Sequence, residues 1–361
     1  MSQVWFFDYS QEKNILKGIQ ALLSESGFES MIPKGGSVAI KLHMGELGNI
    51  RYIRPVFARQ LSDIIRSRNG RPFLVDTVTL YPAERGTKQK YLNTAAKNGF
   101  VEASVNAPVV ITDDGDKHEL IPIRNPVNGC QLTQVKIPSL LIESACILVA
   151  SHVKGHDLTG FGGAVKNLGM GCVSTESKQA QHFVNMPQFN EASCDGCGIC
   201  ADECPTDAIT LVNAKPERDT DKCISCSTCL FKCPSESWVW PTGSKEKFQV
   251  YLAHAASAVL SGCHGKIGFM NFVQDVVPHC DCAAPSGNPL VQDVGILFSL
   301  DPVAIDKASF DLIDRAPIVP GSTSARPPDL LGKLHGTNSL VQLTTAEKLR
   351  MGTLKYKIVP V

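Results

Sequence analysis

The first half of the chain alternates short apolar runs with segments in which apolar residues recur at helical spacing. Residues 14–26 and 55–68 show helical spacing and predict two amphipathic helices, the second beginning at Pro55, which suits a first helical turn. Alternation of strands and helices is typical of a largely parallel sheet with helices on its faces. The runs rich in Val, Ile and Leu, each predicting a buried strand, are 37–42, 72–76, 108–112 and 145–150.

The pattern changes twice further along the chain. Residues 190–242 are rich in Cys, Asp, Gly and Pro, after which runs 266–272 and 293–299 again predict strands and 301–314 an amphipathic helix. We therefore expect an α/β fold, in which a host domain with a mostly parallel sheet is interrupted by a small α+β insert; three independent domains are the alternative. The expected parts are 1–188 for the first part of the host, 189–242 for the insert and 243–361 for the second part of the host.

Composition adds one unusual feature, a total of 14 cysteines in 361 residues. The first nine residues have none of the features of a signal peptide, and no run of 18 apolar residues predicts a membrane span. We therefore expect a cytoplasmic protein, whose thiols stay reduced and are available as metal ligands. Because 35 basic residues balance 35 acidic ones, an overall basic surface for nucleic acid is not expected either.

Eight of the cysteines form two copies of one motif within the insert. Three thiolates in a tight turn can hold three corners of an iron–sulfur cubane while the fourth comes from the other run. Residues 191–241 also contain nine acidic and four basic side chains, a net charge of −5. A zinc-binding double knuckle is the alternative, since Cys-x2-Cys pairs also suit zinc. The two runs are Cys194-x2-Cys197-x2-Cys200-x3-Cys204-Pro205 and Cys223-x2-Cys226-x2-Cys229-x3-Cys233-Pro234.

The double motif resembles the bacterial two-cluster ferredoxins. The second run departs from that pattern after Pro234, where residues 235–240 read SESWVW. Carried over residue by residue, the resemblance assigns one [4Fe–4S] cluster to Cys194, Cys197, Cys200 and Cys233, and the other to Cys223, Cys226, Cys229 and Cys204.

Residues 151–172 are the longest glycine-rich stretch and follow a predicted strand. A strand that leads through glycine into a helix presents backbone N–H groups to an anion or cofactor. The spacing does not fit the dinucleotide fingerprint, and glycines that only permit close packing are the alternative. The candidate cofactor-binding residues are Gly160, Gly162, Gly163, Lys166 and Asn167. The candidate catalytic residues here are His152, Lys154, His156 and Asp157.

Two further polar groups complete the candidate host site. Lys41, His43 and Glu46 follow a predicted strand, and ligands of parallel sheets gather at the carboxyl ends of strands. A structural role for the histidine is the alternative. His279, Cys280 and Cys282 form a second group, which predicts an extra soft-metal or redox site. Cysteines that pack as small apolar residues are the alternative there.

Several of these stretches together resemble the domain-of-unknown-function 362 family of iron–sulfur centre proteins. The resemblance implies an anaerobe-associated iron–sulfur protein and names no reaction. The stretches that carry it are 41–49 (KLHMGELGN), 76–86 (DTVTLYPAERG), 151–172 (SHVKGHDLTGFGGAVKNLGMGC), 279–282 (HCDC) and 293–309 (DVGILFSLDPVAIDKAS).

The function that these patterns favour is that of an oxidoreductase or a redox-driven maturation protein. Electrons would enter through two [4Fe–4S] clusters and pass to a host site that holds a small-molecule substrate, an anionic cofactor or a further metal, with His or Lys moving protons. A redox partner protein is expected; nucleic acid and membranes are not. The alternatives are an electron-transfer subunit whose α/β domain only docks it to a larger complex, and a zinc-binding interaction protein.

Overall fold

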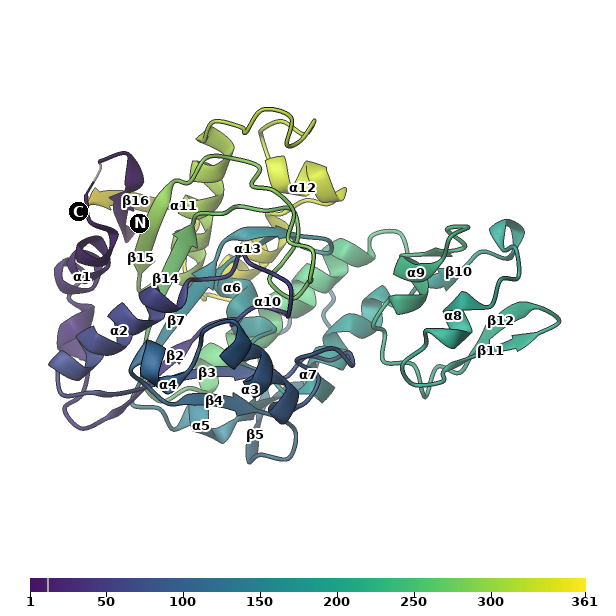
Figure 1. Cartoon of the computed structure of the whole chain (residues 1–361), viewed down its shortest axis with the longest axis horizontal. Coiled ribbons are helices and arrows are strands. Elements are labelled where there is room, and N and C mark those ends of the chain that lie inside the picture. The colour runs from purple at the N-terminus through teal and green to yellow at the C-terminus, as the bar shows by residue number, and fades with distance from the viewer. Residues whose placement is uncertain (12) are drawn as a thin grey trace.

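A computed structural model of the chain describes residues 1–11 and 13–361 and is built around one eight-stranded sheet (Figure 1). The strand order is β16-β1-β15-β14-β7-β2-β3-β4, in which β15 runs antiparallel to both of its neighbours and the other five pairings are parallel. The predicted mostly parallel α/β fold is thereby confirmed. The strands are β1 (Ser2–Asp8), β2 (Ser37–Lys41), β3 (Arg71–Thr77), β4 (Val109–Thr112), β7 (Cys146–His152), β14 (Lys266–Val273), β15 (Gly295–Ser299) and β16 (Tyr356–Pro360).

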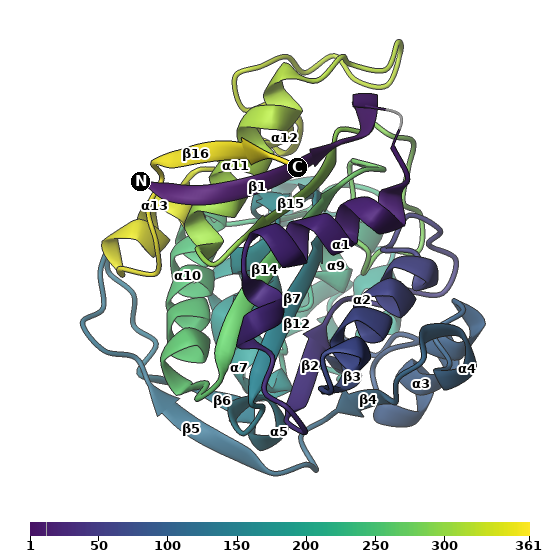
Figure 2. The ribbon, with the colours of Figure 1, turned by 90° about the vertical axis from the view of Figure 1, so that its left-hand side faces the viewer.

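Helices cover both faces of this sheet (Figure 2). Side chains alternate between faces along each strand, so that Ala39 packs in one core and Ile40 in the other. On the Ile40 side lie α1 (Ile15–Glu25) and α2 (Pro55–Ser67), followed by α3 (Lys88–Lys97) and α4 (Glu102–Val105). On the Ala39 side lie α6 (Ala164–Gly169), α10 (Ser244–Gly262), α11 (Pro302–Arg315) and α13 (Val341–Lys348).

Two helix starts follow directly from the sequence. Pro55 begins α2, and its fixed φ suits the first helical position. Asp301 caps α11 by accepting the backbone N–H groups of Val303 and Ala304, both at 2.9 Å. No helix among the described residues is long and apolar enough to span a membrane.

Shorter elements connect the main layers. The β5–β6 hairpin lies at the margin of the host, and β8 pairs with β9 beside α12. The bounds are η1 (Tyr9–Gln11), η2 (Phe28–Met31), β5 (His118–Pro122), β6 (Gln134–Pro138), α5 (Ser139–Ile142), β8 (Lys154–His156), β9 (Gly160–Gly162), α7 (Thr175–His182), η3 (Phe183–Asn185) and α12 (Leu330–His335).

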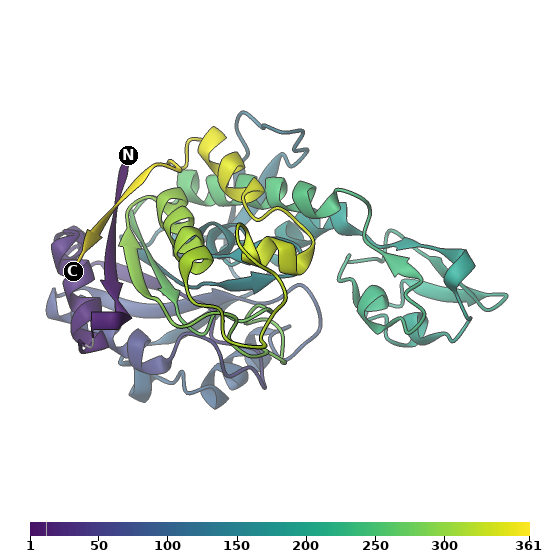
Figure 3. The same cartoon turned by 90° about the horizontal axis from the view of Figure 1, so that it is seen from above.

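The cysteine-rich segment projects from the host on one side (Figures 1 and 3). It has a small core of its own, in which Cys200, Ile209 and Trp238 are buried. The antiparallel pairing of β10 with β13 lies where the segment begins and ends. Its elements are β10 (Gln188–Phe189), η4 (Glu191–Ser193), α8 (Ile199–Asp202), β11 (Ile209–Val212), β12 (Lys215–Arg218), α9 (Thr228–Lys232) and β13 (Trp238–Val239).

Candidate functional site

The host domain has a cavity of about 130 Å³ at the carboxyl ends of β2, β3 and β7. Lys41, Thr77 and His152 end these three strands and line the cavity, which α6 and α7 cover. This is the edge at which ligands of parallel sheets are expected. The predicted site residues that line it are Lys41, His43, His152, Lys154, His156, Gly162, Gly163, Lys166, Asn167 and Cys282. The predicted residues outside its lining are Glu46, Asp157, Gly160, His279 and Cys280.

A buried ion pair forms the floor of the cavity. Lys41, which is 1% exposed, lies with its Nζ atom 2.9 Å from Oδ1 of Asp76 and donates a hydrogen bond of 2.7 Å to Oδ1 of Asn167. The Asn167 amide nitrogen donates to the Ala150 carbonyl, which fixes the amide so that its oxygen faces the lysine. Burial alone would raise the pKa of Asp76, but Lys41 holds it below its usual value. Lys41 is therefore anchored as a fixed charge.

His43 presents an unused donor. Its Nδ1 accepts the backbone N–H of Gly45 at 3.0 Å, so the ring proton resides on Nε2, which is buried without a hydrogen-bond partner in the described part of the chain. Burial, followed by the nearby Arg85, lowers the pKa of His43 well below its usual value. A neutral imidazole with a free N–H is therefore available at the cavity wall.

Glu46 acts through Arg85 rather than at the cavity. Its Oε2 accepts a hydrogen bond of 3.1 Å from Nε of Arg85, a residue that is 3% exposed and lines the cavity. The guanidinium also lies over the ring of Tyr91 at 5.3 Å. Its Nη2 atom is buried and has no partner among the described residues. Glu46 is thus a positioning residue, and Arg85, which the sequence analysis did not select, is the group that reaches the cavity.

His152 and Lys154 share the carboxylate of Asp281. Nδ1 of His152 lies 2.6 Å from one oxygen, and Nζ of Lys154 lies 3.1 Å from the other. Nε2 of His152 lies 2.9 Å from the carbonyl of Gln274, so both ring nitrogens have oxygen partners. His152 therefore ties the end of β7 to the loop before β15, and it has no free nitrogen for a substrate. Although burial alone would raise the pKa of Asp281, Lys154 and His152 hold it well below its usual value.

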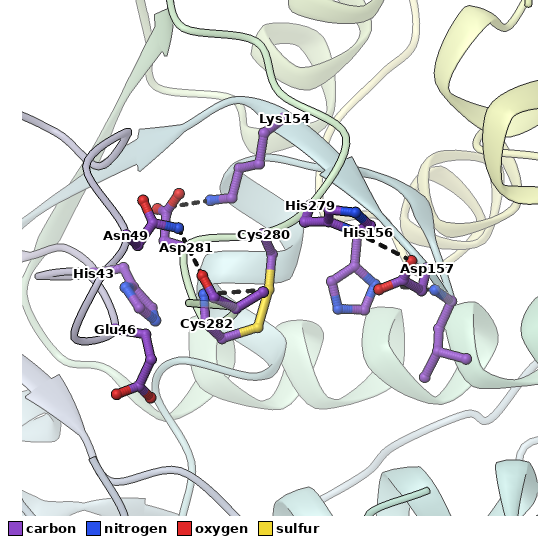
Figure 4. Close-up of a disulfide and its surroundings, with 12 residues drawn as sticks. His43, Glu46, Asn49, Lys154, His156, Asp157, His279, Cys280, Asp281 and Cys282 are labelled. Atoms are coloured by element: carbon purple, nitrogen blue, oxygen red, sulfur yellow. Dashed lines mark hydrogen bonds and ion pairs between the residues drawn. A yellow bond between two sulfur atoms is a disulfide. The ribbon is translucent and has the colours of Figure 1, made fainter. Parts of the chain in front are cut away.

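The predicted His279–Cys280–Cys282 group does not converge on one point. Cys280 and Cys282 are joined as a disulfide, and His279 is turned toward Asp157, whose Oδ1 lies 3.6 Å from its Nδ1 (Figure 4). Nδ1 of His335 lies 3.3 Å from the same oxygen. This arrangement favours a redox pair over an extra metal site. Within residues 1–11 and 13–361, no group of three or more His, Cys, Asp or Glu side chains is arranged for a single metal ion.

Two backbone N–H groups at the start of α6 are occupied by a side chain of the host domain. The carboxylate of Asp306 on α11 accepts the N–H of Ala164 at 2.7 Å and that of Val165 at 2.9 Å. A Cβ atom at Gly163 would lie 2.3 Å from this carboxylate, so glycine is needed for the close approach. These two N–H groups are therefore bound by a carboxylate of the chain itself, while the expectation that the stretch binds an anion or cofactor stays a prediction.

Two lysines lie over the cavity without a carboxylate partner. Nζ of Lys166 on α6 forms no ion pair or hydrogen bond in the described part of the chain, and Nζ of Lys178 on α7 donates only to Thr77 Oγ1 and the Val173 carbonyl. Burial lowers the pKa of each lysine to about 7, and neighbouring cations contribute. Each side chain can therefore give up a proton as the ammonium form, or take one up as the neutral amine, near neutral pH. The sequence analysis selected Lys166 but missed Lys178, which lies outside every motif.

In the insert, cysteines from both runs lie around one cavity. A second cavity is lined by four of them, which are drawn from both runs. The final cysteine of each run has the same local geometry: the sulfur of Cys204 accepts the N–H of Ala208, and that of Cys233 accepts the N–H of Ser237, both at 3.3 Å. The four lining cysteines are Cys194, Cys197, Cys200 and Cys233.

Residues 38–311 match the profile of a family described as a domain of unknown function, DUF362, which covers most of the chain. The chain belongs to the DUF362 family. Five stretches by which the chain resembles DUF362 proteins contribute to the cavity or to its support. The side chains concerned, one from each stretch, are Lys41, Arg85, Lys166, Cys282 and Asp306.

Solved structures offer only distant similarity to this DUF362 chain. A protein from Thermotoga maritima aligns with a TM-score of 0.45 and 11% identity, covering 84% of this chain and 58% of its own. The chain thus spans less than two thirds of that protein. The lactate racemase apoprotein from Thermoanaerobacterium thermosaccharolyticum aligns with a TM-score of 0.41 and 11% identity, covering 100% of this chain and 83% of its own. No curated protein matches the chain.

Proposed function

We propose that the protein is an iron–sulfur redox protein that passes electrons between two [4Fe–4S] clusters in the insert and the cavity of the host domain. The observation that carries this proposal is the cavity in the insert, which is lined by three cysteines of the first run and by Cys233 of the second. This is the ligand set that the ferredoxin resemblance assigns to one cluster. A cubane is larger than a single ion, so its ligands are spread around a cavity rather than gathered at a point.

The surroundings of the cysteines also suit clusters. Cys200, Cys204, Cys229 and Cys233 pack in the small core around Trp238, which would shield the clusters from water. Backbone N–H groups point at the sulfurs of Cys204 and Cys233, and such hydrogen bonds stabilise a coordinated thiolate and tune the potential of the cluster. When bound, the clusters would supply one-electron oxidation and reduction.

The second run lies on the side of the insert that faces the host. Gln179 of α7 donates a hydrogen bond of 3.4 Å to the carbonyl of Cys223, and α7 also carries Lys178 and His182, which line the host cavity. Trp240 forms a second contact between the insert and the host: the centre of its ring lies 4.9 Å from Nζ of Lys245 on α10. Figure 1 shows α9 nearer to the host than the β11–β12 hairpin. The cluster held by Cys223, Cys226, Cys229 and Cys204 is therefore the one adjacent to the host site.

The first run faces outward. Cys197 is exposed, and the insert carries a net charge of −5, which suits a redox partner protein with a basic docking surface.

In the host cavity, Lys166 and Lys178 can exchange protons near neutral pH, as reduction of a substrate requires. Arg85 and His43 offer free N–H groups that can orient this substrate. A domain that only docks the insert to a larger complex would need none of these groups.

The test is metal and sulfide analysis of anaerobically prepared protein, with electron paramagnetic resonance after reduction. We expect eight iron and eight sulfide per chain, from two cubanes. Because the runs interlock, Cys233→Ser should disturb the cluster of the first run and Cys204→Ser that of the second. Cys130→Ser, which changes a buried cysteine of the host, is the matched control. Zinc in place of iron, or iron unaffected by both cluster variants, would contradict the proposal.

A further inference from the structure

We infer that the host cavity is a binding site for a small organic dianion, either a phosphate monoester or a dicarboxylate, held by Lys166, Lys178 and Arg85. This inference deepens the proposed function, since it names the ligand class of the site to which the electrons would pass. It rests on a count of charges and on two buried donors without partners, which are independent of the iron–sulfur assignment.

The charges around the cavity do not balance. Three of the five cations that line it have carboxylate partners, because Lys41 pairs with Asp76, Arg85 with Glu46 and Lys154 with Asp281. The remaining two, Lys166 and Lys178, form no ion pair in the part of the chain that the structure describes. With both protonated, the group carries a net charge of +2. A ligand with two negative charges would neutralise it, whereas a monoanion would leave one buried cation uncompensated.

Two side chains of the cavity lining carry unused donors. Nη2 of Arg85 and Nε2 of His43 are buried and lack hydrogen-bond partners among the described residues, although both side chains line the cavity. An unpartnered buried donor is costly, so such groups in a cavity wall point to a ligand that supplies the acceptors. Oxyanions supply several acceptors, and guanidinium and ammonium groups are their usual partners.

Two backbone N–H groups beside the cavity are not available to a ligand. The N–H groups of Ala164 and Val165 at the start of α6 are taken by Asp306, which leaves the side chains as the main donors. Part of the wall is apolar, including Val78, Leu80 and Met170, which suits a ligand with a carbon body. The volume of about 130 Å³ is sufficient for a small organic ligand.

Binding should be accompanied by proton uptake. Burial lowers the pKa of Lys166 and of Lys178 to about 7, and a dianion beside them would raise both. The charged and titratable groups that act on these two lysines are Lys41, Asp76, Arg85, Asp114, Lys154, His156, His182 and Asp281. Above neutral pH, the complex should therefore hold more protons than its separate components.

The experiment is isothermal titration calorimetry of the anaerobic protein with three probes: inorganic phosphate, malonate and acetate. Titrations are run in buffers of different ionisation enthalpy, which reports proton uptake. We expect one dianion to bind at least about tenfold more tightly than acetate, with net proton uptake slightly above neutral pH. The preference between phosphate and malonate identifies the oxyanion.

Variants decide whether this cavity is the site. Lys166→Gln removes a side chain with no partner, so the fold should persist while dianion affinity and proton uptake both fall; exposed Lys117→Gln is the matched control. Three outcomes would overturn the inference. They are acetate binding as tightly as the dianions, no binding of any probe, and a dianion affinity in Lys166→Gln equal to that of the parent protein. Iron analysis of the same samples tests the proposed function separately. Binding of a dianion to the host cavity does not require reduced clusters, so either proposal can fail without the other.

Discussion

The carboxylate of Asp306 on α11 accepts the backbone N–H of Ala164 at the first turn of α6, with the two atoms 2.7 Å apart. Its other oxygen accepts the N–H of Val165, and Asn271 also donates to the group. In an Asp306→Asn variant, the side-chain NH₂ would have to face one of these donors. We expect the free energy of unfolding to fall by about 2 kcal/mol, measured by urea denaturation. Exposed Asp221→Asn, which should change stability little, is the control.

The same carboxyl group predicts a pH dependence. Burial raises the pKa of Asp306 from 3.8 to about 6. Between these values the folded protein keeps a proton that the unfolded chain releases, so this group lowers stability as pH rises through that window and contributes no further change above it. The change is on the order of 3 kcal/mol. Asp306→Asn should remove this pH-dependent change in the free energy of unfolding. If the stability of the variant falls with pH as steeply as that of the parent protein, another group is titrating.

The pair of Lys41 and Asp76 predicts a strong stability coupling. Lys41→Met would leave a buried carboxylate without its cation, at a cost of about 3–5 kcal/mol. Adding Asp76→Asn should restore part of the loss, because no buried charge then remains. A double-mutant cycle in urea denaturation measures this coupling, and additive effects of the two substitutions would argue against it.

Lys166 should react at neutral pH. With a pKa of about 7 it is about half uncharged there, whereas an ordinary lysine with a pKa near 10.5 is almost entirely protonated. Cyanate is small enough to enter the cavity and carbamylates only the neutral amine. Peptide mapping after reaction at pH 7 should show Lys166 labelled well before exposed Lys117. Equal rates at the two positions would contradict the lowered pKa.

Cys280 and Cys282 should resist alkylation until a reductant is added. In denatured protein without reductant, the peptide that contains both should remain unlabelled and be lighter by two hydrogens, whereas Cys130 should be fully labelled. In Cys282→Ser, Cys280 should be labelled without a reductant. Mass spectrometry of the peptides provides the measurement, and labelling of both cysteines before reduction would show that the bond is absent.

Apolar periodicity predicted the sheet well. The runs 37–42, 72–76, 108–112 and 145–150 correspond to β2, β3, β4 and β7, since consecutive buried strands leave a strong local signal. Polar residues after β2 and β7 were correctly expected to lie near each other, because carboxyl ends of parallel strands meet at one edge.

The finer structure of the site depends on contacts between distant parts of the chain. Nothing near Gly163 reveals that Asp306, 143 positions further along, occupies the N–H groups of α6. Glu46 and His279 lie in polar motifs, yet they are engaged by Arg85 and Asp157 and do not reach the cavity. Lys178 belongs to no motif, and only the packing of α7 brings it to the site.

The antiparallel pairing of β10 with β13 means that the chain leaves the host and returns to it at adjacent points. The host sheet can therefore close without waiting for the intervening residues to fold. If the insert binds the proposed clusters, their loading can follow as a separate event, and the host can stay folded when iron is scarce. By the same connectivity, an ancestral host could have gained or lost the whole insert in one step, with the cavity left in place.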